Sequence, residues 1–479
     1  MSQDLSVSSD RDRTLDLATY LSKLTYDDIP NDVVHIAKAS ILNSVGCGLS
    51  SAMLEPAKKL FAALDVTGKK PRPVTVLARP EHATVDDAAL LNGLSMTARF
   101  FDDTHLGTVI HPSGPPLAAI LAYAEAHHMS GKDVIVAFLV GVETLLAVGY
   151  ALGLGPYRKG WHLTSITGTF GATAAIAKLM NLPPEKFAIA FGHASSMAAG
   201  SRGVFATDTL IMHAGRAAQN GLLAARIARE GFGSTTHALE KWVQLISVGD
   251  SNPSLVSAPA DAKPNERKWE ILENAFKPYP CGIVIHPIID AGVEGHQYFF
   301  KSDDSPIKGK SPRDALDIFP EIEVLVTPLT LRLCSVKHPE NFPQVMFSTY
   351  HGLAVGLVYG NGGIKEFSGE VANDPVIKAL RDRTTLKTDD SLGDDQASVT
   401  FTYSSSTGRG EKKVFIEHAT GSLLNPMTDK QLDTKFLDQA IAGNVDKGSA
   451  SEALKELWDL EKVDDIGSVM KKLVSASVP

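Results

Sequence analysis

The spacing of apolar residues changes twice along this chain of 479 residues, and this change constrains the fold more than any other feature. From Asp10 to about Gly233 the spacing is helical. Between about Lys277 and Val414 short β-like runs appear, and after Pro426 the helical spacing returns. The pattern predicts a mainly α protein with a large discontinuous all-helical domain, which carries an inserted smaller α+β domain.

The expected boundaries follow from these changes. We predict the first part of the helical domain at 1–268, the α+β domain at 269–424, and the second part of the helical domain at 425–479. Within the α+β domain we expect helices at 283–298 and 347–358. The β-like runs are 322–326, 329–333, 398–403 and 414–416, and the last two are separated by a Ser/Gly-rich turn typical of a hairpin.

Two helical segments invite other interpretations. The longest apolar stretch, near Val134–Leu154, carries Glu143 at its middle, where a carboxylate would be costly in lipid, so we expect a buried helix and no membrane contact. The segment Thr167–Ala175 contains glycines, but no strand precedes it and no GxGxxG follows. Close packing of helices through small residues is therefore favoured over a phosphate-binding loop.

Composition narrows the class of partner and the compartment. The net charge is −9, the pI is near 5.9, and no run of Lys and Arg occurs, which disfavours a nucleic-acid partner but permits a small carboxylate substrate. Cys47, Cys281 and Cys334 lie far apart, which fits a reducing compartment. The first residues contain no apolar signal region, so we expect a cytoplasmic protein.

The densest group of chemically active side chains lies between two apolar helical segments. Asp102, Asp103, Thr104, His105 and His111 fall within ten residues, just before the helix start at the Gly-Pro-Pro sequence that follows. Polar groups this dense are costly to bury unless they have partners or perform chemistry. A capped corner with histidines facing water is the alternative for any one of them; for the set we predict a site.

A second group follows further along the chain. His162 stands beside Trp161 and a basic Arg-Lys pair, just before a helix, and it fits a base or a hydrogen-bond donor as well as a stacking or capping residue. Arg202 suits bidentate binding of a carboxylate, and His213 lies near it at the start of another helix. Arg216 is more typical of a salt bridge.

The segment that opens the α+β domain supplies further candidates. Lys277 offers a cation and Tyr279 a phenol between two prolines, whereas Cys281 is expected to be a buried, inert thiol. No metal-ligand spacing, serine nucleophile motif or phosphate-binding motif appears. Acid–base chemistry by histidines and carboxylates remains, with cationic side chains orienting an anion.

Together these residues resemble a known family. The segments Phe101–His105, His111–Ser113, Gly160–His162, His213–Gly221 and Lys277–Cys281 are similar to those of the MmgE/PrpD family, over nearly the whole chain. That family includes 2-methylcitrate dehydratase, cis-aconitate decarboxylase and iminodisuccinate epimerase. The resemblance implies a helical domain built from both chain ends, an inserted α+β lid, a homodimer, and neither metal nor organic cofactor.

The resemblance also suggests roles and differences. His111 and His162 match active-site histidines of the decarboxylase branch, Thr104 matches a site threonine, and Asp102 and Asp103 match the paired aspartates. The branch has an aspartate, a lysine and a histidine at three site positions where this chain has other residues: Phe100, Leu210 and Gly282.

These replacements predict a more apolar anion, and we expect a hydro-lyase for an alkylcitrate. His111 and His162 would move a proton, one of the two aspartates would fix a histidine tautomer, and Arg202 and Lys277 would hold carboxylates. The remaining predicted substrate-binding residues are Thr104, His105, His213 and Tyr279. A decarboxylase, an epimerase and a catalytically inactive dimeric protein are the alternatives.

Overall fold

The computed structural model describes residues 12–64, 73–249, 251–256, 268–340 and 342–475. These residues form two compact units. The larger unit takes its residues from Met1–Ala98, Asp102–Asn274 and Asp429–Pro479, and the smaller unit takes Arg99–Phe101 and Ala275–Thr428. Each unit is described by itself.

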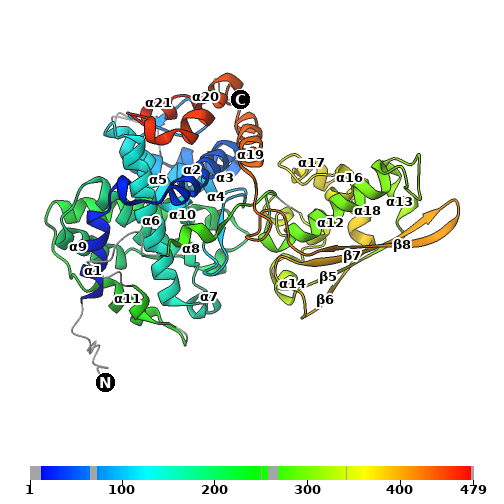
Figure 1. Ribbon diagram of the computed structural model, residues 1–479, viewed down its shortest axis with the longest axis horizontal. Coiled ribbons are helices and arrows are strands. Elements are labelled where there is room, and N and C mark those ends of the chain that lie inside the picture. Colours follow the sequence, from blue (N-terminus) through cyan, green and yellow to red (C-terminus); the bar gives the residue numbers. More distant parts are fainter. Residues whose placement is uncertain (1–11, 65–72, 250, 257–267, 341, 476–479) are drawn as a thin grey trace. The chain divides into compact units, whose positions relative to one another are not determined.

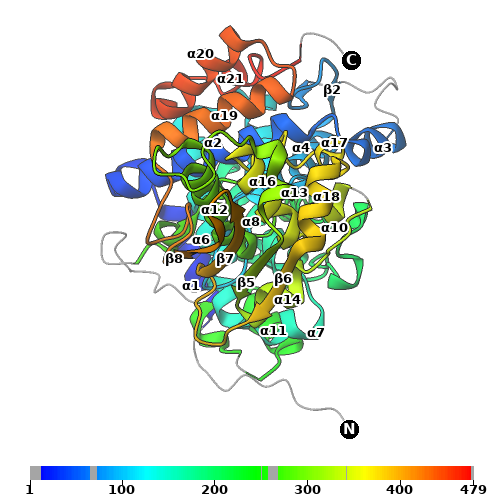
Figure 2. The ribbon, with the colours of Figure 1, turned by 90° about the vertical axis from the view of Figure 1, so that its right-hand side faces the viewer.

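The larger unit is built almost entirely of helices (Figure 1). Its helices are α1 (Arg13–Lys23), α2 (Asn31–Ser51), α3 (Glu55–Ala63), α4 (Val85–Thr97), α5 (Gly114–Ala126), α6 (Gly131–Leu152), α7 (Gly155–Lys159), α8 (Leu163–Leu179), α9 (Pro184–Ser195), α10 (Asp208–Arg229), α11 (Ala238–Ile246), α19 (Asp429–Ala442), α20 (Lys447–Trp458) and α21 (Gly467–Met470). Strand β1 (Val74–Thr75) pairs with β2 (His82–Ala83), and β3 (Thr104–His105) precedes α5. Helix α19 lies beside α2, so the end of the chain packs against its beginning (Figure 2).

Helix α8 is the centre of this unit. Every residue of α8 except Lys178 is buried, and the helix contacts α5, α6, α9 and α10. A helix that is apolar on all sides belongs in the interior of a large domain. Its first turn is consequently held in place by neighbours on several sides, which makes it a rigid support for the residues that precede it.

Small residues allow the helices around α8 to approach one another closely, as predicted. A Cβ atom added at Gly215 in α10 would lie 2.1 Å from the carbonyl oxygen of Leu90 in α4, and one added at Gly93 would lie 2.6 Å from Gly215 Cα. No side chain fits at such distances. The glycines therefore set how closely α4 and α10 pack.

The long apolar helix α6 is buried. By length and composition it could cross a membrane, but 89% of its most apolar window lies inside the structure. Glu143, 2% exposed, accepts a hydrogen bond of 3.0 Å from the backbone N–H of Ile271. The carboxylate that argued against a membrane span thus has a partner within the larger unit.

The smaller unit combines a four-stranded sheet with short helices. The strands are β5 (Glu321–Val326), β6 (Thr384–Thr388), β7 (Ala397–Ser405) and β8 (Gly408–Ile416), in the order β6-β5-β7-β8. Strand β5 runs parallel to β6 and antiparallel to β7, and β7 and β8 form the predicted hairpin. The helices are α12 (His286–His296), α13 (Ala315–Ile318), α14 (Pro328–Cys334), α15 (Phe342–Val345), α16 (Thr349–Tyr359), α17 (Gly369–Ala372) and α18 (Pro375–Arg383).

Helices α12, α16 and α18 lie along one face of this sheet (Figure 1). The core between them includes Phe299, Phe319 and Phe401, whose rings meet edge-on or tilted with centroids 4.9–6.0 Å apart. Aromatic pairs in such geometries add about 0.5–1.5 kcal/mol each beyond the burial of their surface. Cys281 is fully buried as well, and burial raises the pKa of its thiol well above the ordinary value, so it is the inert thiol we expected.

One predicted strand is wrong. Residues 329–333 belong to helix α14, although their alternation of leucine with polar residues suggested a strand. The side chain of Thr327 accepts a hydrogen bond from the backbone N–H of Thr330, and Pro328 occupies the first helical turn. These two helix-starting signals decide the local structure, since a cap and an N-terminal proline both favour a helix.

Candidate functional site

The backbone and side chain of His111 are both held by hydrogen bonds. Its backbone N–H donates to Thr164 Oγ1 in the first turn of α8 (3.0 Å), and its Nδ1 lies 2.8 Å from the carbonyl oxygen of Asp103. Thr104 Oγ1 is 3.1 Å from the same nitrogen, and Asp102 Oδ2 is 3.8 Å from it. A carbonyl oxygen only accepts hydrogen bonds, so Nδ1 carries a hydrogen, and the neutral ring therefore presents its lone pair at Nε2.

The two adjacent aspartates have different surroundings. Asp103 is fully buried, and its Oδ2 accepts hydrogen bonds from Ser113 Oγ and from Asn274 Nδ2 (2.5 Å). Burial raises the pKa of Asp103 to about 6, although both hydrogen bonds oppose the rise. The carboxylate of Asp102 is the one that faces His111, whereas Asp103 reaches that ring only through its backbone carbonyl.

His162 stands at the N-cap of α8, where an antiparallel bridge holds the chain. Its backbone N–H donates to Gly200 O (3.0 Å), and the backbone N–H of Arg202 donates to Gly160 O (2.8 Å). The His162 side chain contacts His213 on α10, with 2.9 Å between the two Nδ1 atoms. Burial, and then the nearby positive charges of His213, His111 and Arg202, hold the pKa of His162 well below its usual value.

His111 and His162 are both attached to the start of α8. Both precede helices, α5 and α8, that pack against each other, and Thr164 of α8 binds the backbone of His111. The start of a helix carries partial positive charge and favours anions. This corner of the larger unit suits a negatively charged substrate that lies within reach of an imidazole.

Arg202 adds a fixed positive charge to the same corner. Its guanidinium stacks on the Tyr157 ring at 3.8 Å from the centroid, and Nη1 donates to the carbonyl of Tyr157 (2.8 Å). Its Nε is buried and has no hydrogen-bond partner among the residues that the structure describes. A buried guanidinium donor of this kind is suited to bind a carboxylate.

The other predicted residues lie elsewhere or have other partners. His105 is fully buried, with Nδ1 3.0 Å from Thr108 Oγ1 and its ring edge-on to Tyr150. Lys277 and Tyr279 belong to the smaller unit, where Lys277 Nζ donates to Phe100 O (3.2 Å) and the Tyr279 hydroxyl donates to Asp290 Oδ1 (2.6 Å). Their roles toward a substrate stay predictions.

The replaced family positions also divide between the units. Leu210 is buried on α10, three residues before His213. Phe100 and Gly282 belong to the smaller unit, where the Phe100 ring meets Phe347 edge-on and a Cβ at Gly282 would lie 2.7 Å from Cys334 Sγ. Gly282 therefore could not carry a histidine without a local rearrangement.

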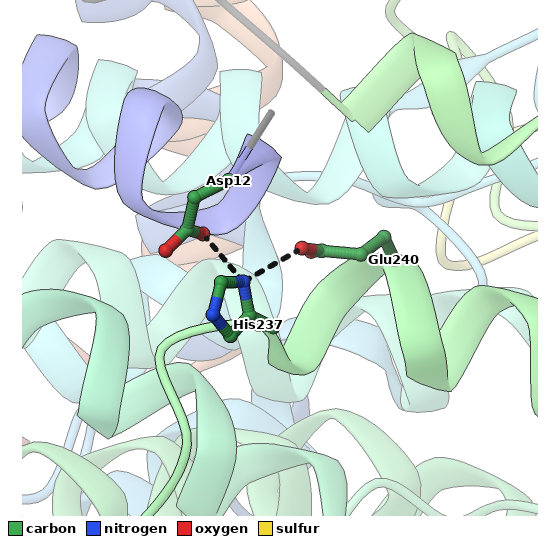
Figure 3. A group of neighbouring side chains, drawn as sticks. All are labelled: Asp12, His237 and Glu240. Atoms are coloured by element: carbon green, nitrogen blue, oxygen red, sulfur yellow. Dashed lines mark ion pairs between the residues drawn. The ribbon is translucent and has the colours of Figure 1, made fainter. Parts of the chain in front are cut away.

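Two groups of side chains have ligand types that could hold a metal ion. In the first, the carboxylates of Asp12 and Glu240 point at Nδ1 of His237, at 3.2 and 3.7 Å (Figure 3). Asp12 also caps α1 through the backbone N–H of Leu15 (3.0 Å), and Glu240 accepts a hydrogen bond from Thr14 Oγ1. These bonds join α1 to α11, so we attribute this group of side chains to the packing of the two helices.

The second group contains His105, Glu270 and Glu273. His105 Nε2 lies 3.8 Å from Glu270 Oε2. The ammonium of Lys268 lies 2.7 Å from Glu273 Oε1 and 3.4 Å from Glu270 Oε2. A lysine thus supplies the positive charge that these carboxylates need.

The hydrogen-bond partners of the site are what sequence reasoning missed. Thr164, Ser113 and Asn274 hold His111 or Asp103, and Tyr157 holds Arg202. Ser113 and Thr164 do follow the two histidines by two residues, at the starts of helices, where hydroxyl side chains are common. Nothing in the sequence separates Asn274 from other asparagines, because its role depends on a contact across 171 residues.

Comparison with known proteins identifies the family of this chain. Residues 15–250 match the model of the MmgE/PrpD N-terminal domain, and residues 279–460 match that of the MmgE/PrpD C-terminal domain. The chain therefore belongs to the MmgE/PrpD family, as the sequence motifs suggested.

The names of three relatives agree, since each contains the words cis-aconitate decarboxylase. The chain is 32% identical over 394 residues to the cis-aconitate decarboxylase-like protein oryM of Aspergillus oryzae, which covers 78% of this chain and 79% of the relative. It is 26% identical over 290 residues to cis-aconitate decarboxylase of Aspergillus terreus, with 58% of this chain and 59% of the relative covered. It is 24% identical over 394 residues to cis-aconitate decarboxylase of Mus musculus, with coverages of 78% and 75%.

Proposed function

We propose that this protein is a lyase for a citrate-like or aconitate-like acid, and that it moves a proton at a carbon next to a carboxylate. The observation that carries the proposal is that His111 is bonded through its backbone to Thr164 in the first turn of α8, the helix that His162 caps, and that Arg202 is bonded to Gly160 beside it. One imidazole presents a lone pair and the other stays neutral beside positive charges. Both are suitable for proton transfer near neutral pH.

Each residue has a definite task in this proposal. Arg202 binds a substrate carboxylate through Nε, which has no hydrogen-bond partner among the described residues. His162 Nε2 accepts a proton from the neighbouring carbon, while its Nδ1 stays bonded to His213. His111 acts as the acid through Nε2, and the carboxylate of Asp102, 3.8 Å from Nδ1, stabilises its imidazolium form.

Dehydration is the reaction we put forward first. After His162 takes the carbon-bound proton, the electron pair forms a double bond and the hydroxyl group on the next carbon leaves, protonated to water by His111. Leu210, an apolar residue on α10 near His213, supports a substrate with an alkyl group, as expected for an alkylcitrate.

Decarboxylation is the second candidate, and the names of the relatives favour it. In that reaction a carboxylate leaves as CO₂, and the electron pair left on carbon takes a proton from an imidazole. The same residues serve both reactions because each needs one proton moved at a carbon next to a carboxylate.

Incubation of the purified protein with 2-methylcitrate, cis-aconitate and iminodisuccinate separates the possibilities. New ultraviolet absorbance from a double bond indicates dehydration, CO₂ release indicates decarboxylation, and inversion of optical rotation indicates epimerisation. His111→Ala is the negative control for each assay. The proposal fails if the folded protein turns over none of these acids, or if turnover does not depend on His111.

The family resemblance supports two further proposals: we propose that the protein is a homodimer and that the smaller unit acts as a lid. The wide spacing of the three cysteines supports a third, that the protein works in the cytoplasm. Light scattering that gives about twice the chain mass of 51.2 kDa would confirm the dimer.

A further inference from the structure

A hydrogen bond joins the imidazoles of His162 and His213. Their Nδ1 atoms lie 2.9 Å apart, and the rings are tilted by 37° with centroids 5.1 Å apart. One Nδ1 must donate a hydrogen and the other must accept it. In the uncharged pair, the donor ring therefore has its lone pair at Nε2, and the acceptor ring has its hydrogen there.

The surroundings decide which ring holds an added proton. The groups that face His162 are His213 from α10, His111 from the loop before α5, and Arg202 from the segment before α10, and each disfavours a positive charge on His162. For His213, burial alone lowers the pKa. An added proton is therefore more stable on His213, where burial is the cause of the lowered pKa, than on His162, where three cationic groups add to it.

We propose that His213 is a positioning residue for His162 and stores the proton that His162 exchanges with the substrate carbon. His162 Nε2 accepts a proton, the hydrogen on its Nδ1 passes to His213 Nδ1, and His213 becomes the imidazolium while His162 returns to neutral. The reverse sequence delivers the proton to carbon. This inference rests on the proposed function, and it assigns His213 to His162 rather than to the substrate.

A purely structural bond would serve equally well to fix the ring, so the test must separate orientation from proton storage. His213→Asn places an amide near the position of Nδ1, which keeps a hydrogen bond to His162 but cannot take up a proton. His213→Phe removes both abilities while it fills a similar volume. Neither variant can store a proton, but only His213→Asn keeps a hydrogen bond that fixes the tautomer of His162.

Nitrogen NMR of ¹⁵N-histidine-labelled protein reads the tautomer and the titration of His162 directly. The protein has 15 histidines, and His162→Gln identifies the resonance. In the native pair, the charge of protonated His213 holds the pKa of His162 down, so we expect both variants to raise the pKa at which His162 titrates. We expect His213→Asn to retain a single tautomer of His162 and His213→Phe to give a mixture.

Kinetics supply the second readout. Both variants should lower kcat by about 10²-fold, the lower end of what a general acid–base group contributes, with little change in KM. The acidic limb of the pH–kcat/KM profile should move to higher pH, because neutral His162 is lost at a higher pH once the charge of His213 is absent. Native kcat in His213→Asn would overturn proton storage, and an unchanged His162 titration in His213→Phe would overturn the whole inference.

A matched control removes another buried histidine from the same unit. His193→Asn is suitable, because His193 is 7% exposed and its Nε2 donates to the carbonyl of Phe232. It should leave kcat and the His162 resonance unchanged. If the native protein turns over no acid, the proposed function fails, but the NMR titration still tests the pair in the same sample.

Discussion

Replacing Asp103 by asparagine should stabilise the protein at neutral pH. The carboxyl group is fully buried, and burial raises its pKa to about 6. Both of its hydrogen bonds reach Oδ2, whereas Oδ1 has no partner among the described residues. An asparagine with its oxygen at the Oδ2 position keeps both bonds, and its amide nitrogen replaces an atom that was already unpaired.

The expected gain in the free energy of unfolding follows from the pKa of Asp103 in the unfolded chain and in the folded protein. A rise from the ordinary value of 3.8 to about 6 corresponds to about 3 kcal/mol. Between these pH values the folded protein keeps a proton that the unfolded chain has released, so stability falls as the pH rises through this window. The Asp103→Asn variant does not lose stability in this way. Its free energy of unfolding should exceed that of the native protein by almost nothing at about pH 4, by about half of the full difference at about pH 5, and by about 3 kcal/mol above about pH 7.

The assay is urea or thermal unfolding of both proteins at matched pH values. Asp303→Asn is the control: the Asp303 side chain is fully exposed, so the same chemical change there should alter stability by less than about 0.5 kcal/mol. A loss of stability in Asp103→Asn at pH near 7.5 would refute the reasoning, because it would mean that the ionised carboxylate is favoured in the folded state. A gain that does not depend on pH would refute it equally.

Three further substitutions test other parts of the structure. His111→Ala should lower kcat by about 10²–10⁴-fold without loss of helical circular dichroism, since it removes a general acid–base group; an unchanged rate would remove His111 from the mechanism. Gly215→Ala should destabilise the protein by about 2 kcal/mol or more in urea unfolding, because its Cβ would lie 2.1 Å from Leu90 O, and an unchanged midpoint would contradict the close approach. Arg202→Lys should raise KM more than it lowers kcat, since an ammonium cannot replace a stacked guanidinium, and an unchanged KM would exclude Arg202 as the carboxylate ligand.

The periodicity of apolar residues predicted much of the fold because burial determines those elements. Helices α19 and α20 lie in the segment after Pro426 where helical spacing returns, and strands β5 and β7 include the apolar runs that suggested them. Strand β6 was missed because its sequence, Thr-Thr-Leu-Lys-Thr, is largely polar and sits at the edge of the sheet, where half-burial leaves little alternation.

For the site, residue types were easier to predict than partners. The sequence drew attention to His111, His162 and Arg202 because reactive side chains precede helix starts there. It could not pair His162 with His213, since the hydrogen bond depends on how α8 and α10 pack across 51 residues. Nor could it distinguish the two aspartates, because their separation into one that faces His111 and one that faces Ser113 is set by the loop conformation.

Burial shifts several ionisable groups of the site toward their neutral forms before a substrate binds. It lowers the pKa of His162 and His213 and raises that of Asp103, while the guanidinium of Arg202 disfavours a proton on His162. A substrate carboxylate at Arg202 would offset the repulsion that disfavours a proton on His162, so binding should raise the pKa of His162.

The pH profiles report this change. The neutral form of His162 is lost as the pH falls through its pKa. The pH profile of kcat/KM reports the pKa in the free enzyme, whereas the pH profile of kcat reports the pKa in the substrate complex. The acidic limb should therefore lie at higher pH in the kcat profile than in the kcat/KM profile. Arg202→Met removes the repulsion in the free enzyme and should bring the two limbs together. Coincident limbs in the native enzyme would show that the substrate charge does not reach His162, and the carboxylate would then have to bind away from Arg202.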